Sequence, residues 1–173
     1  MMRWATMIKI LLIAVLLSLL VASCKQQPST TLPSLDVSAP QVLSVEMQGL
    51  IDGGNAYVGA KVQNSTPHPV LIAAATAAAE DQARRCLQGH HDWDRRFREL
   101  QVELPGMTPA EICAESWYDQ RNDSPAELGY EMFKCWHWSP GHWNVAKRQH
   151  TYWGGSMAKG QNGIWYSCII VAD

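Results

Sequence analysis

The first strong pattern along the chain is an apolar run near its start. Residues 10–20 are almost entirely aliphatic, and Arg3 and Lys9 precede them. The run is too short to span a membrane comfortably, and small residues follow it before a cysteine, as in a secretory signal. The segment Val-Ala-Ser-Cys at residues 21–24 is typical of a lipobox, in which the cysteine thiol takes a diacylglycerol.

We therefore predict a lipoprotein signal peptide over residues 1–23 and lipidation of Cys24. An uncleaved N-terminal anchor helix is the alternative. Residues 24–41 are rich in Gln, Ser, Thr and Pro and have no apolar period, so they predict a flexible tether behind the lipidated cysteine. One folded domain is expected over residues 42–173, a common size for a single domain.

Helical periodicity dominates the first half of this domain. Residues 42–57 have apolar positions at helical spacing, although three glycines weaken the pattern. A stronger helix is predicted from Pro69, which suits a first helical position, to a stop at Gly89. Its buried stripe is rich in alanine and permits close packing.

The second half predicts a third helix and then strands. Ser124 and Glu127 form a capping box around a proline, and the Ser-Pro-Gly at residues 139–141 ends the helix. Residues 151–159 and 164–172 read as an antiparallel hairpin across a Gly-containing turn.

A further strand is predicted over residues 112–118. Strands that do not alternate strictly with helices favour an α+β layered domain over a doubly wound parallel sheet.

Charge argues against a nucleic-acid partner. Residues 1–23 hold two of the 14 Lys and Arg and none of the 16 Asp and Glu, so the mature chain has a net charge near −4. Phosphate binding needs a basic face. The closest basic cluster is Arg95, Arg96 and Arg98, and if these residues lay on a helix they would mostly form a solvated face.

With Cys24 assigned to lipid, four cysteines remain in a compartment that permits disulfides. Three pairings are possible, and the sequence does not choose between them. The C-x-x-C spacing of a zinc site is absent, so bridges or buried free thiols are favoured. The disulfide candidates are Cys86, Cys113, Cys135 and Cys168.

Two segments, residues 89–97 and 136–143, concentrate histidine and tryptophan around glycine-containing turns, and acidic residues join them in the first. Imidazoles brought together from two loops can bind a divalent metal, and a nearby carboxylate can act as a base. The alternative is that these residues are ordinary packed or hydrogen-bonded side chains, since no fixed metal-ligand spacing is present.

The order of these segments resembles the CAP superfamily, which includes cysteine-rich secretory proteins, insect antigen 5 and plant pathogenesis-related proteins. Residues 70–85 look like the Ala-rich helix of the family, and His91-Asp92 with Arg96 looks like its histidine loop. Residues 114–116 (Ala-Glu-Ser) look like its Gly-Glu-Asn strand, and residues 136–142 match its bacterial tryptophan-to-histidine segment. The resemblance implies an α-β-α sandwich with a small antiparallel sheet between helices.

The resemblance also implies a ligand cleft lined by His91, Glu115 and His142, with the two histidines able to hold zinc or another divalent metal. Ser139 occupies the position where animal members have a second glutamate. Two alternatives stay open, because His90 can replace His91 and Glu111 can replace Glu115.

Three functions are compatible with these features. The favoured one is an envelope lipoprotein, anchored to a membrane through Cys24, whose cleft binds a small molecule, a lipid or an envelope protein. The second is a metal-assisted hydrolase of the peptidase type with Glu115 as catalytic general base. The third is a structural lipoprotein without a working cleft. Lys25 after the lipidated cysteine favours the outer membrane where the cell has one.

Overall fold

The computed structural model describes residues 43–116 and 123–173. The predicted signal peptide, the tether and Cys24 lie outside the described residues, as does the end of the strand predicted to reach Tyr118. Among the described helices, none combines the length and hydropathy that a membrane crossing requires.

The helices and strands follow one another in the order α2 (Val45–Ala56), η1 (Val62–Asn64), β1 (Thr66–Pro67), α3 (Pro69–Arg85), α4 (Trp93–Glu103), β2 (Pro109–Glu115), α5 (Pro125–His137), α6 (Pro140–Ala146), β3 (Tyr152–Lys159) and β4 (Trp165–Ala172).

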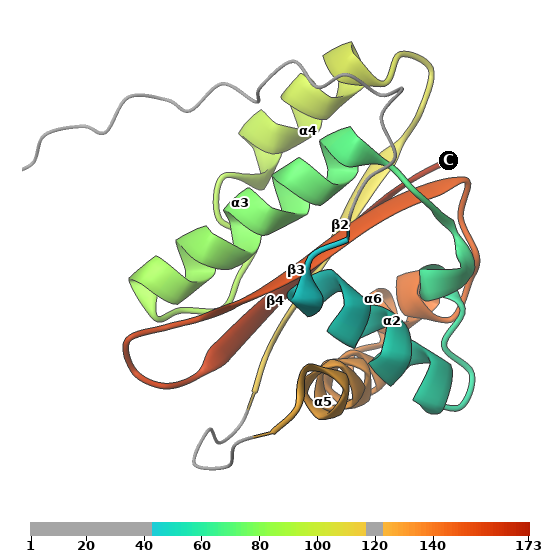
Figure 1. Ribbon diagram of the computed structural model, residues 1–173. Helices are drawn as coiled ribbons and strands as arrows, with labels where there is room; N and C mark the ends of the chain where they lie inside the picture. Colours follow the sequence, from blue (N-terminus) through green and yellow to red (C-terminus); the bar gives the residue numbers. More distant parts are fainter. Residues whose placement is uncertain (1–42, 117–122) are drawn as a thin grey trace, which may run out of the picture. The chain divides into compact units, whose positions relative to one another are not determined.

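The four strands form one sheet in the spatial order β1-β3-β4-β2. The β3–β4 hairpin and the β2–β4 pair are antiparallel, and the two-residue β1 adds a short parallel pair beside β3. In the described part of the chain β2 is therefore an edge strand. Figure 1 shows α3 and α4 on one face of the sheet and α2, α5 and α6 on the other. The predicted α+β class and the sandwich layering are confirmed. The sheet is mixed and not purely antiparallel, because β1 pairs in parallel with β3.

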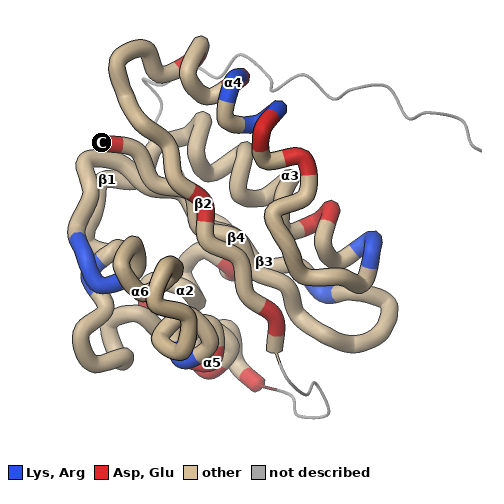
Figure 2. Tube along the Cα trace, turned by 180° about the vertical axis from the view of Figure 1, so that it is seen from behind, with Lys and Arg blue, Asp and Glu red and all other residues tan. Residues whose placement is uncertain are grey.

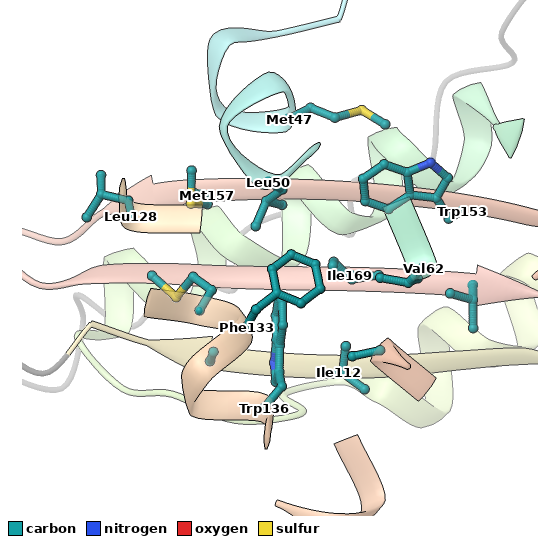
Figure 3. Packing of buried hydrophobic residues seen from close by; sticks show 14 residues of the cluster. Met47, Leu50, Val62, Ile112, Leu128, Phe133, Trp136, Trp153, Met157 and Ile169 are labelled. Carbon is teal, nitrogen blue, oxygen red and sulfur yellow. The ribbon is translucent and has the colours of Figure 1, made fainter. Parts of the chain in front are cut away.

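The larger core lies between the sheet and the layer of α2, α5 and α6. Phe133 and Trp136 of α5 pack edge to face, with ring centroids 5.1 Å apart. Figure 3 shows both rings facing the strands, near Ile112 of β2 and Ile169 of β4. These side chains are almost completely buried, which removes a large apolar area from water and fixes α5 on the sheet.

Glycines in α2 allow a close helix crossing. A side chain at Gly53 would collide with the backbone of Gly129 and Tyr130 in α5, and one at Gly49 would collide with Pro125. The glycines that weaken the helical pattern by propensity are therefore the residues that let α2 lie against α5. The helix predicted over residues 42–57 is confirmed as α2.

The predicted Ala-rich helix, the capping-box helix and the terminal hairpin are also present. In α5 the Ser124 hydroxyl accepts from the Glu127 backbone N–H, and the Glu127 carboxylate accepts from the Ser124 backbone N–H. Two helices were not predicted. These are α4, whose buried positions include an arginine, and the short α6, which begins at the proline expected only to end α5.

The contact between α3 and the hairpin gives a direct test of the packing. We expect Gly154→Ala in β3 to lower the free energy of unfolding by about 3 kcal/mol, because the added Cβ would overlap the backbone of Leu71 and Ile72 in α3. Gly141→Ala is the control, since nothing lies within 4 Å of its Cβ position. Urea unfolding curves measure both, and equal stabilities of the two variants would contradict this packing.

Candidate metal centre

The edge strand β2 carries two polar side chains into a buried environment. Glu111 and Cys113 are two residues apart and therefore lie on the same face of the strand. Cys113 belongs to the core cluster formed with α3 and α4, so this face points toward that helical layer. The side chain of Glu111 has no exposed surface, although a carboxylate is costly to bury unless it is paired.

The loop between α3 and α4 brings His90 to this strand. The helix ends at Cys86 in the left-handed conformation, and the next residues fold back. The Gln88 side-chain amide donates to the Cys113 carbonyl at 3.0 Å, and the Gly89 backbone N–H donates to the Gln82 side chain at 3.2 Å. These bonds tie the loop to both β2 and α3, which positions the His90 ring over the strand.

Three different ligand types meet at this point. The His90 Nδ1 lies 3.0 Å from the Glu111 Oε1 and 3.8 Å from the Cys113 Sγ. The Cys113 Sγ lies 3.7 Å from the same Glu111 oxygen. Within the part of the chain that the structure describes, this group of ligand atoms, all within 4.8 Å of one another, can hold a metal ion.

The second oxygen of Glu111 is held by Arg96 of α4. The Nε and Nη2 atoms of Arg96 both donate to the Glu111 Oε2, at 3.0 and 2.7 Å. Both side chains are buried, so this is a charge-assisted pair away from water. Arg96 therefore departs from the solvated face expected for the basic cluster. The pair fixes the carboxylate and docks α4 against β2.

His90 also contacts a residue from the opposite helical layer. The His90 Nε2 lies 3.2 Å from the Nε2 of His142, near the start of α6. The contact is possible because β2 is an edge strand, so residues from the two layers can meet around it. Figure 2 shows β2 passing between α4 and α6, with acidic positions along it.

Local interactions shift the pKa values of this cluster. Hydrogen bonds with Cys113 and Glu111 raise the pKa of His90 to about 10, so its ring is an imidazolium at neutral pH. Burial and then the charge on His90 lower the pKa of His142. The two rings are therefore complementary: His90 donates its Nδ1–H to Glu111 and its Nε2–H to the neutral His142.

The two cysteines behind His90 are affected as well. The hydrogen bond from the Cys168 thiol lowers the pKa of Cys113. Burial, followed by that same hydrogen bond, raises the pKa of Cys168. Cys113 is thus the thiol of this pair that ionises more readily.

The structure separates the residues of the expected cleft. The His91 Nε2 contacts the Leu87 carbonyl at 3.1 Å, and His90 takes the place beside His142. Glu115 is on the same face as Glu111, but four residues along a strand put their Cα atoms about 13 Å apart. Ser139 is the N-cap residue of α6, without a side-chain capping bond.

The open alternatives His90 and Glu111 are the ones that the structure brings together. The four disulfide candidates are all free thiols in the structure.

A pocket of about 580 Å³ lies elsewhere, between α2, α3 and the end of β3. None of the residues that the sequence assigned to the cleft lines it. The candidate centre is instead a compact polar cluster at the sheet edge, and its exposed component is His90, with 42% of its side chain accessible.

Comparisons with known proteins add no relative. No family model matches the chain, and a search of curated proteins finds no match. The resemblance to the CAP superfamily therefore stays a prediction.

The buried pair predicts a large and specific stability effect. Glu111→Gln should lower the free energy of unfolding by about 3 kcal/mol, because it leaves the buried Arg96 charge without its counter-charge. Glu131→Gln is the control, since its pair with Lys134 is exposed on α5 and such pairs contribute about 1 kcal/mol or less. Urea denaturation measures both, and an effect of Glu111→Gln no larger than that of the control would contradict a buried charge pair.

Proposed function

We propose that this chain is a lipid-anchored envelope protein whose domain binds zinc at His90, Glu111 and Cys113. The observation that carries the proposal is the convergence of an imidazole nitrogen, a carboxylate oxygen and a thiol within 4.8 Å. Zinc uses all three ligand types and favours a tetrahedral arrangement.

The spacing of the three atoms supports a shared metal. Zinc bonds of about 2.0–2.3 Å that meet at a tetrahedral angle set neighbouring ligand atoms roughly 3.3–3.6 Å apart. The separations in this cluster are 3.0, 3.7 and 3.8 Å. Side-chain shifts of a few tenths of an ångström, with release of the His90 Nδ1 proton and the Cys113 thiol proton as zinc binds, would therefore satisfy the coordination, with Nδ1 as the histidine ligand.

The ligand chemistry selects the class of metal. A buried thiolate is a soft ligand that disfavours magnesium and calcium, which take oxygen ligands, and suits zinc or a similar transition metal. With three protein ligands, the fourth position is left for water or for a bound partner on the accessible side of His90.

The surrounding contacts support a prearranged site. Metal-bound histidines commonly hydrogen-bond a second group through their other ring nitrogen, and ligating carboxylates are themselves held. Here His142 lies at the free Nε2 of His90, and Arg96 holds the outer oxygen of Glu111. His142 is therefore a positioning residue, whereas the sequence predicted it as a ligand.

The open fourth position favours metal-assisted hydrolysis as a second candidate, because catalytic zinc sites also have three protein ligands. A general base is then required near the metal-bound water. Glu115 lies too far along β2 for that role, and Glu111 is engaged by Arg96 and His90. We therefore favour a binding function.

Two adjacent histidines provide a matched test. The purified wild-type chain should bind one zinc ion, and His90→Ala should abolish that binding by removing a ligand. His91→Ala should leave it unchanged, because the His91 ring contacts the Leu87 carbonyl. Zinc measured by elemental analysis after gel filtration, together with calorimetric titration, gives stoichiometry and affinity.

His142→Ala distinguishes a positioning residue from a ligand. It should weaken zinc binding by about 10- to 100-fold, as loss of an outer-shell partner does, without abolishing it. Zinc retained in His90→Ala, or no zinc in the wild-type chain, would contradict the proposed function and leave a structural role.

The membrane anchor rests on the sequence at residues 21–24. In cells, Cys24→Ala should move the protein from the membrane fraction to the soluble extracytoplasmic fraction, because acyl chains provide the anchor. Zinc binding should persist in the released protein. Continued sedimentation of Cys24→Ala with membranes would contradict lipidation at this residue.

A further inference from the structure

A second cysteine lies directly behind the candidate metal centre. In the antiparallel β2–β4 pair, Cys113 stands opposite Cys168 in register. Both side chains are buried and belong to the same core cluster, on the face covered by α3 and α4.

This placement meets the geometric requirement of a disulfide. Directly opposed residues in antiparallel strands have Cα atoms about 4.5–5.5 Å apart, and disulfides span Cα separations of roughly 4.4–6.8 Å. The register fixes both backbones, so a bond between the thiols needs side-chain rotation and little backbone movement. Cys86 and Cys135 lie elsewhere, at the end of α3 and in α5.

We propose that Cys113 and Cys168 are an oxidisable pair whose disulfide withdraws the thiolate ligand from the metal group. The effect on the metal rests on the proposed function, whereas the disulfide itself rests on the strand register alone. Cys113 belongs to both arrangements, and a sulfur bonded to Cys168 is no longer a thiolate that can ligate zinc.

The burial of the pair indicates a small oxidant. Both thiols are inaccessible to a protein disulfide, but the Cys113 Sγ contacts the half-exposed His90 ring. A peroxide is small enough to reach the sulfur when that ring moves aside. The Cys113 thiolate attacks one peroxide oxygen, the O–O bond breaks and a sulfenic acid forms, while the leaving hydroxide takes up the proton that the Cys113 thiol released and becomes water.

The Cys168 thiol then completes the reaction. Its sulfur attacks the Cys113 sulfur, the S–O bond breaks, and the hydroxyl leaves as water with the Cys168 proton. In total two thiols and one hydrogen peroxide give one disulfide and two waters. A thiol reductant reverses the result by exchange.

The test uses the full chain carrying Cys24→Ser, Cys86→Ser and Cys135→Ser, so that the pair provides the remaining thiols. After treatment with hydrogen peroxide and unfolding in alkylating reagent, mass spectrometry should show a chain lighter by two hydrogen atoms and without alkyl groups. Two alkylated thiols, or oxygen added to each sulfur, would contradict the proposal that Cys113 and Cys168 form a disulfide.

A single replacement shows whether Cys168 is the partner. In the same background, Cys168→Ala should gain oxygen on Cys113 under peroxide and form no intramolecular disulfide. This variant leaves all three proposed zinc ligands in place, so its zinc binding before oxidation reports whether the site has survived the substitution.

Zinc content separates the two proposals. The oxidised pair should lose its bound zinc, and a thiol reductant should restore binding. Disulfide formation with zinc retained would contradict the proposed link between oxidation of the pair and loss of the metal. A reduced chain that never binds zinc would overturn the proposed function and the coupling with it, while the mass measurement would still decide whether the disulfide forms.

Discussion

The buried carboxylate of Glu111 is the constraint on which the candidate centre depends. It has no exposed surface, and each of its oxygens has a charged or polar partner, Arg96 on one side and His90 on the other. A lone carboxylate in this environment would be strongly unfavourable, so the fold must bring both partners to it. Through Arg96 it joins α4 to β2, and through His90 it fixes the loop between α3 and α4.

This arrangement links stability and chemistry in the same residues. The hydrogen bonds that satisfy Glu111 also set the distances between His90, Glu111 and Cys113, so the potential ligands are positioned before any metal arrives. Prearranged ligands lose less conformational freedom on binding. Because β2 is at the edge of the sheet, His142 from the opposite helical layer also reaches His90. The polar cluster therefore contains residues from both sides of the sheet.

Local signals made much of the fold predictable. Each of these signals lies within a few residues of the element that it predicts. They are the capping box of Ser124 and Glu127, the first-turn Pro69 and the Gly-containing hairpin turn, and the two helices and the hairpin are present. The helix α4 was missed because its inward face includes Arg96, which counts as polar in any hydrophobic pattern. The burial of Arg96 depends on its pair with Glu111 in strand β2. A hydrophobic pattern within α4 gives no sign of that partner.

The candidate centre was less predictable for the same reason. His90 and His91 are adjacent in a loop, and their directions depend on left-handed backbone at Asp92 and on bonds from Gln88 to β2. Strand β2 begins three residues before its predicted start, which brings in Glu111. The alternation of Glu111, Cys113 and Glu115 was the available signal that these side chains share a face.

The most direct measurement of the central claim is the absorption spectrum of the cobalt(II)-loaded chain. Coordination by Cys113, His90 and Glu111 predicts a sulfur-to-cobalt charge-transfer band together with the intense visible bands of a tetrahedral ion. The charge-transfer band should disappear in Cys113→Ala and remain in Cys86→Ala, whose thiol lies at the end of α3. A weak spectrum without charge transfer, or a band that survives Cys113→Ala, would contradict a metal centre built on this strand.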